Sequence, residues 1–500
     1  MADTLKERGF FWWFNDPSLP ARSLDTSVPG LLTITDDGQI TLETDGSLCL
    51  KGEYQDWSES RILPESRRVH GLLASRDKSD RYVLLERLER TDLSFFDTSP
   101  QLQRFSAEMC TSRDSPFPDG YPEGFAELRI PLDGFEDWLE LESITVEREY
   151  SESDKVTVHV NYKEWKFEYP LPSGSISIES VTTGALPFLS DDVPTASAEF
   201  RQHYYLVFTP NSPGDASGLR YVYTKIEELL AVLLGSYHNL SWPILTTRDD
   251  FDTWNTIHFY RDTPPRPVNK FSVWIPFARI RERFGDLFQK WVVRSESFGA
   301  GYYLYVSALR NPHQYAEHRF VNLIWAIEAL HRKWLGESET SPRVINERKR
   351  VQDILNLVPE ESENRKWLRE KLAHAHELSL RNRILECFAK LPFVFGEGEL
   401  EKFAKNCAVR RNDISHRGGP PENVGYESFH SQISKLGDAL DHLFHALLLH
   451  QIGIEPKTLR ERMTEGLISR RVREALLNVG LSVSSGTLVA SDPTINDVQD

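Results

Sequence analysis

Residues 399–421 are ELEKFAKNCAVRRNDISHRGGPP, in which an arginine interrupts a periodic apolar stripe. The apolar side chains step by three or four residues: Leu400, Phe403, Ala404, Cys407 and Ile414. This spacing predicts a helix over residues 399–417 that turns one face toward a core. Arg411 falls on that face, where a helical bundle normally buries a hydrophobic side chain. A charge there is costly unless the face opens onto a cleft or a second subunit.

The end of this helix places a second titratable group at an exposed position. The segment Gly418-Gly419-Pro420-Pro421 predicts that the helix stops there, so His416 lies in the last turn, where the helix dipole favours imidazolium. Asn412 precedes His416 by four residues and shares its helix face. Arg411 lies about 140° from His416 around an ideal helix, but its long side chain can reach toward the same pocket.

These residue types suit the cleavage of RNA by its own 2′-hydroxyl group. A histidine can act as base or acid near neutral pH, and an arginine offers a planar fork to phosphate oxygens. Asn412 could orient the imidazole or hold a phosphate. The reaction leaves a 2′,3′-cyclic phosphate and a 5′-hydroxyl, and no metal or other cofactor is expected. Because acid and base roles call for two histidines, we expect at least a symmetric dimer with two antiparallel motif helices.

The rest of the chain predicts an α+β multidomain protein, β-rich first and all-helical at the end. Alternating apolar residues and Asp-Gly turns indicate hairpins between residues 32 and 54. Further strands are expected at 82–88, 156–160, 203–209 and 302–306. Further helices are expected at 223–234, 320–334, 343–357, 362–390, 426–451 and 457–478.

Composition limits the partners and the compartment. The net charge of −17 argues against whole-surface binding to nucleic acid, but residues 402–417 hold five cations against one anion. Four separated cysteines fit a reducing cytoplasm, and the segment Met1–Pro20 lacks the pattern of a signal peptide. No apolar run is long enough for a membrane span. RNA is the expected partner, with transfer RNA as one candidate, and neither DNA nor a membrane is expected.

The motif Arg411-Asn412-x-x-x-His416 resembles the R-[polar]-x(3)-H signature of HEPN ribonucleases. Residues 320–334, with Glu328, resemble the first long helix of that family, and the order of regions resembles ApeA-type anti-phage defence proteins. The resemblance implies an endoribonuclease that acts by abortive infection, with Arg411 and His416 catalytic, Asn412 as the polar second position and Glu328 in support. A phage-derived trigger is the candidate activator.

The resemblance gives four regions. Residues 1–200 are a β-rich sensor or regulatory domain, and residues 201–311 are a mixed α/β continuation or linker. Residues 312–455 are the HEPN ribonuclease domain, and residues 456–500 are a C-terminal helix with a loose tail.

Several alternatives stay open. Arg410 directly precedes Arg411, so either arginine could face the phosphate. Glu328 could be a surface or salt-bridging glutamate. A second R-x4-H match, Arg369 to His374, lies among charged residues typical of a solvated face, and His374 and His376 have the wrong helical spacing for a shared metal. The competing function is a catalytically inactive HEPN scaffold that binds RNA or a protein partner.

Overall fold

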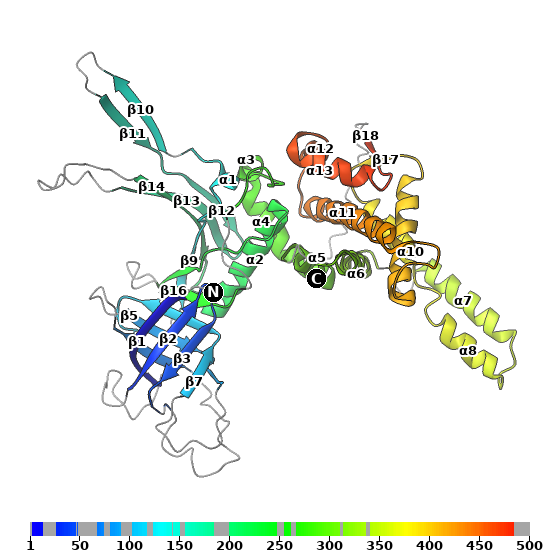
Figure 1. Cartoon of the computed structure of the whole chain (residues 1–500), viewed down its shortest axis with the longest axis horizontal. Coiled ribbons are helices and arrows are strands. Elements are labelled where there is room, and N and C mark those ends of the chain that lie inside the picture. Colours follow the sequence, from blue (N-terminus) through cyan, green and yellow to red (C-terminus); the bar gives the residue numbers. More distant parts are fainter. Residues whose placement is uncertain are drawn as a thin grey trace, which may run out of the picture. The chain divides into compact units, whose positions relative to one another are not determined.

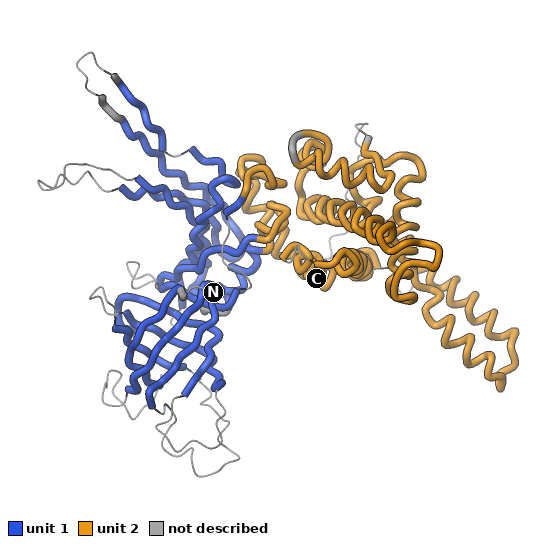
Figure 2. Tube along the Cα trace, viewed as in Figure 1, with its two compact units in different colours: residues 1–227, 238–268 blue, residues 228–237, 269–500 orange. Residues whose placement is uncertain are grey.

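The structure is a computed structural model, and its chain divides into two compact units. It describes residues 3–13, 27–46, 48, 68–74, 81–91, 103–117, 124–142, 144–150, 156–184, 200–247, 255–261, 267–310, 314–336 and 341–484. Unit 1 comprises residues 1–227 and 238–268, and unit 2 comprises residues 228–237 and 269–500 (Figure 2). Among the described helices, none has the length and apolarity needed to cross a membrane.

Unit 1 is built on a 14-stranded antiparallel sheet. The strands of unit 1 are β1 (Asp3–Trp13), β2 (Val28–Thr35), β3 (Ile40–Thr44), β4 (Val69–Leu73), β5 (Arg81–Glu86), β6 (Glu89–Arg90), β7 (Gln103–Ala107), β8 (Met109–Arg113), β9 (Phe125–Pro131), β10 (Ile144–Tyr150), β11 (Val156–Tyr162), β12 (Lys166–Leu171), β13 (Gly174–Gly184), β14 (Phe200–Pro210), β15 (Ile244–Thr247) and β16 (Asn255–Phe259). The order is β12-β13-β14-β9-β15-β16-β8-β5-β4-β1-β2-β3-β7-β6, and β10 and β11 form a separate hairpin. The β-rich N-terminal region is therefore confirmed.

Close packing around one aromatic ring fixes the middle of this sheet. Phe11 in β1 is fully buried, between the neighbouring strands β2 and β4. A Cβ added at Gly71 would lie 2.6 Å from the Phe11 ring, so only glycine leaves room for it. Gly38 adopts a φ of 78° in the turn between β2 and β3, which gives the expected hairpin.

Unit 2 is helical. Two of the described helices come earlier in the chain. The short helix α1 (Glu136–Leu139) belongs to unit 1, and the long helix α2 (Ala216–Leu234) is divided between unit 1 and unit 2. The remaining helical elements are α3 (Phe277–Ile280), η2 (Arg281–Arg283), α4 (Phe284–Phe298), α5 (Ala300–Arg310), α6 (Ala316–Trp334), α7 (Pro342–Asn356), α8 (Glu363–Leu372), α9 (Leu380–Phe388), α10 (Glu399–Arg417), α11 (Tyr426–Gln451), α12 (Pro456–Thr464) and α13 (Gly466–Leu477). Two short strands, β17 (Val394–Phe395) and β18 (Val483–Ser484), pair with each other.

The core of unit 2 forms around α6 and α11. The second half of α11 is apolar on nearly all sides and is buried from Leu443 to Leu449. Helix α6 packs against α5, α9, α10 and α11 (Figure 1). The predicted helices at 399–417 and 426–451 have the bounds of α10 and α11, so the all-helical C-terminal region is confirmed.

Three predicted elements are wrong. Residues 302–306 lie in helix α5 rather than a strand, because Tyr302, Tyr305 and Val306 share a buried helix face. The predicted helix 362–390 is two helices, α8 and α9, separated by a turn after which the Ser379 side chain caps α9. The helix predicted at 457–478 also divides, with a break at Glu465 between α12 and α13. The described residues end at Ser484, so the predicted loose tail lies outside them from residue 485 onward.

Candidate nucleic-acid cleavage site

Helix α10 carries the motif and ends where the glycines predict. Gly418 adopts the left-handed conformation with a φ of 72°, and its N–H group donates to Ile414 O at 3.2 Å. The Gly419 N–H group donates to Asp413 O at 3.3 Å, which completes the C-terminal cap. His416 therefore lies in the last turn of the helix and is exposed.

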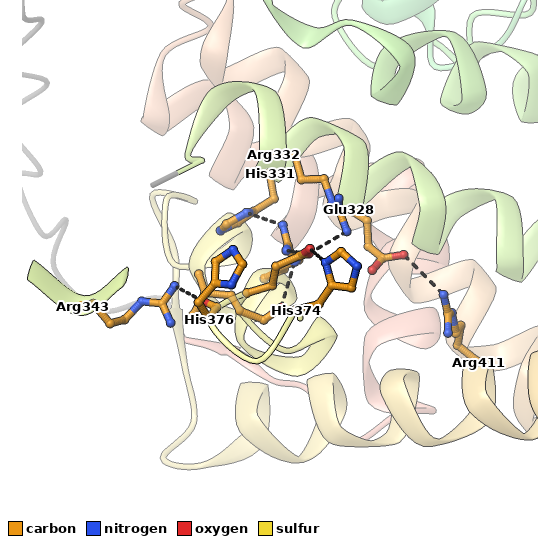
Figure 3. A network of polar contacts seen from close by, with 10 residues as sticks. Glu328, His331, Arg332, Arg343, His374, His376 and Arg411 are labelled. Carbon is orange, nitrogen blue, oxygen red and sulfur yellow. Dashed lines mark hydrogen bonds and ion pairs between the residues drawn. The ribbon is translucent and has the colours of Figure 1, made fainter. Parts of the chain in front are cut away.

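Arg411 continues the buried stripe of α10 and faces α6. A guanidinium nitrogen of Arg411 lies 3.8 Å from a carboxylate oxygen of Glu328 in α6, and the two side chains are 25% and 20% exposed (Figure 3). A second guanidinium N–H donates to the Asn412 side-chain oxygen at 3.4 Å. The Nε atom of Arg411 is buried and has no hydrogen-bond partner within the described residues. The guanidinium is thus held loosely and retains a donor without an acceptor.

Arg410 is engaged elsewhere. It donates to Asp413 at 2.6 Å and to Gln432 at 2.8 Å, and its guanidinium lies over the ring of Phe429. Asp413 is 5% exposed and also pairs with Arg417 at 3.4 Å. These contacts use the charge of Arg410 to neutralise a buried carboxylate. Arg411 is therefore the arginine with capacity to bind a phosphate.

The structure brings together only part of the predicted set. Arg411, Asn412 and Glu328 lie together, whereas His416 makes no hydrogen bond or ion pair with the described residues around it. Asn412 and His416 are both exposed. The histidine and the arginine of one chain are separated around the helix, as the spacing of the motif predicts.

A polar network next to Glu328 was not predicted from the sequence. Glu377, in the turn between α8 and α9, accepts hydrogen bonds from Arg332 at 3.0 Å, from Arg383 at 3.0 Å and from His374 at 2.8 Å (Figure 3). Arg332 lies one helical turn after Glu328 in α6. The network therefore borders the ion pair between Glu328 and Arg411.

A buried histidine extends this network toward α9. His331 is 1% exposed and donates from Nε2 to the Glu386 carboxylate at 2.8 Å, while its Nδ1 lies 3.5 Å from a guanidinium nitrogen of Arg383. The spacing of Glu328, His331 and Arg332 in α6 is a signal that sequence reasoning could have used. No comparable signal marks Glu377 or Arg383, because both lie where one continuous helix was predicted.

Charge within the network follows from burial and proximity. Burial, then the neighbouring charge of Arg332, lowers the pKa of Arg383, although Glu377 and Glu328 act in the opposite direction. Burial acts to raise the pKa of Glu377, but Arg332, His374 and Arg383 outweigh it and hold that pKa below its usual range. Glu377 therefore stays an anion that joins Arg332, Arg383 and His374.

The second R-x4-H match occupies a different environment. Arg369 is exposed in α8, and the His374 side chain is 81% exposed, so the expected solvated face is confirmed. His374 and His376 lie in a turn and not in a helix, which corrects the helical geometry expected for them. Among the described residues, no group of three or more His, Cys, Asp or Glu side chains is placed to hold a metal ion.

Comparison with known families covers most of the chain. Residues 6–291 match the family model described as ApeA N-terminal domain 1, and residues 321–458 match the family model described as Apea-like HEPN. The comparisons with curated proteins and with solved structures gave no match. The first family model alone spans more than half of the chain, and the second includes most of α6 and all of α10 and α11. The chain therefore belongs to the ApeA family, with an ApeA N-terminal domain followed by an ApeA-like HEPN domain.

Proposed function

We propose that this chain is a metal-independent endoribonuclease that defends its cell against phage by abortive infection. The observation that supports the proposal is the incomplete pairing of Arg411 in the helical core. Arg411 occupies a core position of α10. Within the described part of the chain, it has only a 3.8 Å ion pair and a 3.4 Å hydrogen bond, and its buried Nε donor has no partner. A purely structural residue at this position would be apolar or fully paired.

In the proposed reaction, Arg411 binds the non-bridging oxygens of the scissile phosphate. A histidine removes the proton of the 2′-hydroxyl, whose oxygen attacks phosphorus, and the bond from phosphorus to the 5′-oxygen breaks. A second acid gives a proton to the leaving 5′-oxygen. The products are a 2′,3′-cyclic phosphate and a 5′-hydroxyl.

Glu328 and Asn412 act as positioning residues in this scheme. Glu328 attracts the guanidinium of Arg411 from α6, and Asn412 accepts one of its N–H groups. Both contacts are long enough to yield to a phosphate, which attracts a guanidinium more strongly than an amide oxygen does. Arg410 stays with Asp413 and supports the helix.

The proposal includes a dimer in which two α10 helices meet in antiparallel order. Within one chain, Arg411 faces α6 and His416 is exposed in the last turn. A symmetric partner would bring its own His416 toward the Arg411 of the first chain. HEPN domains are commonly ribonucleases that dimerise, and the family assignment adds to this expectation. The β-rich region would restrain the site until a phage-derived trigger appears.

The first test is cellular, because infection supplies the trigger that the proposal includes. Wild type, Arg411→Ala and His416→Ala are expressed and challenged with a phage panel, and plaquing and transfer RNA integrity are followed. His318→Ala is the matched control, because His318 is an exposed histidine of α6 without a role in the site. His374 is unsuitable as a control because it binds Glu377.

We expect wild type and the His318→Ala control to protect the cells and to produce RNA fragments that end in 2′,3′-cyclic phosphate. Both site variants should lose the protection and the fragments. Full protection by His416→Ala would contradict the proposal that His416 takes part in catalysis. The helical domain would then be a scaffold that binds RNA or a protein.

A further inference from the structure

The helical hairpin formed by α7 and α8 is exposed on almost every side. Helix α7 buries only Val344 and Leu355, and α8 buries no residue. Figure 1 shows the pair extending from the other helices of unit 2. We name residues 341–372 the α7–α8 arm. A hairpin with so small a core contributes little to the stability of the domain.

Charge in the arm is segregated along its length. The half of the arm next to the rest of unit 2, residues 343–350 and 366–371, holds seven cations against two anions. The cations are Arg343, Arg348, Lys349, Arg350, Lys366, Arg369 and Lys371. The tip, residues 351–365, holds one cation against four anions. A net +5 beside a net −3, in a chain of net −17, marks the first half as a local basic surface.

Most of this charge is unpaired and accessible. Lys349, Lys366, Arg369 and Lys371 are exposed, and none forms an ion pair with a described residue. Arg365, by contrast, is 12% exposed and donates to Val358 O at 3.0 Å, so it acts within the arm. Lys366 and Arg369 are three residues apart and share one face of α8, so their like charges repel each other, and a polyanion would relieve that repulsion.

A large aromatic side chain of α8 lies beside one of these cations, Lys371. Trp367 is 57% exposed, and Lys371 follows it by four residues on the same face of α8. Trp325 in α6 is 46% exposed and precedes Glu328 by three residues, so it shares that face of α6. Indole rings on which bases stack, interleaved with phosphate-binding cations, are typical of proteins that bind single-stranded nucleic acid.

Contacts connect the basic half of the arm to the cleavage site. Arg343 in α7 donates to His376 O at 3.0 Å, in the turn that also contains Glu377. Glu377 binds Arg332, which lies one turn after Glu328 in α6, and Glu328 pairs with Arg411. Figure 3 shows the contact of Arg343 near His376 and, separately, the pair of Glu328 and Arg411. The basic half of the arm therefore contacts the turn that binds α6, and α6 also carries the Glu328 of the candidate site.

We propose that the basic half of the α7–α8 arm binds the phosphate backbone of single-stranded RNA and holds it for cleavage at Arg411. This inference rests on the proposed function and adds a substrate class, a strand long enough to reach both Arg411 and the arm. Trp367 stacks on an unpaired base, while Lys349, Lys366 and Arg369 contact phosphates. An interface with another protein is the weaker interpretation, because interfaces are depleted of lysine at their centre.

The test measures RNA binding separately from cleavage, with full-length His416→Ala protein and a fluorescently labelled single-stranded RNA. The arm variant adds Lys349→Gln, Lys366→Gln and Arg369→Gln. The matched control adds Arg470→Gln, Arg471→Gln and Arg473→Gln in α13, which removes the same charge from exposed positions elsewhere in unit 2. Circular dichroism checks that each protein folds.

We expect the arm variant to bind at least about tenfold more weakly and the control to bind within about twofold of the parent. The slope of log affinity against log salt should flatten by about 2, or roughly 0.7 for each lost phosphate contact. Trp367→Ala should weaken binding about tenfold and Trp367→Phe by much less. In proteins that retain His416, cleavage of a long RNA should fall with the arm variant, while cleavage of a dinucleotide stays unchanged.

Unchanged RNA binding by the arm variant overturns the proposal, and so does an equal loss in both triple variants. A change in molar mass by light scattering, without a change in RNA affinity, identifies the arm as a protein interface and also overturns it. If only the arm variant loses RNA binding and no protein cleaves RNA, the result supports RNA binding by the arm and refutes the proposed ribonuclease activity.

Discussion

Substitutions of the adjacent residues Arg410 and Arg411 should have different effects, one mainly on stability and the other mainly on cleavage. We expect Arg411→Ala to lower kcat/KM about 100- to 1000-fold, the usual effect of removing a donor to a developing oxyanion. Its effect on folding should be small. At 3.8 Å, the attraction between Arg411 and Glu328 is roughly 1 kcal/mol in water and roughly 4 kcal/mol at an effective dielectric of 20. Because both side chains are partly exposed, the net contribution is about 1 kcal/mol or less.

Arg410→Ala should show the reverse. Arg410 is 18% exposed and pairs at 2.6 Å with Asp413, which is 5% exposed. Its removal leaves Arg417, at 3.4 Å, as the one cation paired with that buried carboxylate among the residues that the structure describes. The loss of one partner of a buried pair costs several kcal/mol, and Arg417 offsets part of it, so we expect about 2 kcal/mol. For a helical unit of this size, the Tm should fall by about 4–8 °C, while kcat/KM stays within about threefold.

The assay is thermal unfolding of each full-length variant, followed by cleavage of an end-labelled RNA below the lowest Tm. The double variant Arg410→Ala/Asp413→Asn is the control for the buried charge, and it should recover part of the lost Tm. Loss of cleavage in Arg410→Ala at unchanged Tm, with normal cleavage by Arg411→Ala, would show that the two roles are reversed.

Three further predictions follow from the site and the core. A mixture of Arg411→Ala and His416→Ala chains should recover about a quarter of wild-type cleavage if each site takes one residue from each chain, since half of the random dimers are mixed and half of their sites are intact. If cleavage is not recovered, either each site takes Arg411 and His416 from the same chain, or each site needs the histidines of both chains. Cleavage should persist in excess EDTA, and its loss there would indicate a metal site. Burial lowers the pKa of His445 to about 3, where Tyr305 donates to its Nδ1 at 2.5 Å. Its contribution to stability is therefore complete above about pH 6.5 and is lost as the pH falls from 6.5 toward 3, by about 1.4 kcal/mol per pH unit. Chemical denaturation of wild type and His445→Leu at pH 7.5 and 5 measures this slope, which should be smaller in the variant.

The helical elements that the sequence predicted well have their own local signals. Helix α10 was predicted with the bounds observed because a periodic stripe runs into two glycines and two prolines. Helix α5 was not, because Tyr302, Tyr303, Tyr305 and Val306 favour a strand by propensity. In the folded protein, packing of Tyr302 against Trp291 of α4, with ring centroids 4.8 Å apart, favours the helix. That contact depends on tertiary structure, so no local pattern reveals it.

Some residues of the candidate site likewise have a local sequence signal, and others do not. Arg411 could be identified because one chain position broke a periodic pattern, and its neighbour Glu328 because α6 has its own periodicity. Glu377 could not, because its importance comes from a turn that brings two arginines and a histidine to one carboxylate. The sequence also left Arg410 and Arg411 equivalent, and only the contacts of each guanidinium distinguish them.

The two halves of the motif have different surroundings, which bears on how the site is assembled. Arg411 is held between helices by α6, so its position depends on the fold of one chain. His416 is exposed in the last turn and is fixed by no neighbour within the described residues. A general base needs a fixed orientation, because proton transfer requires hydrogen-bond distance to the hydroxyl. The arrangement therefore favours a site that is incomplete in one chain, in which a second copy or the bound RNA orients His416. Such a site would also let a trigger control the enzyme through assembly, without any change in the interior of the domain.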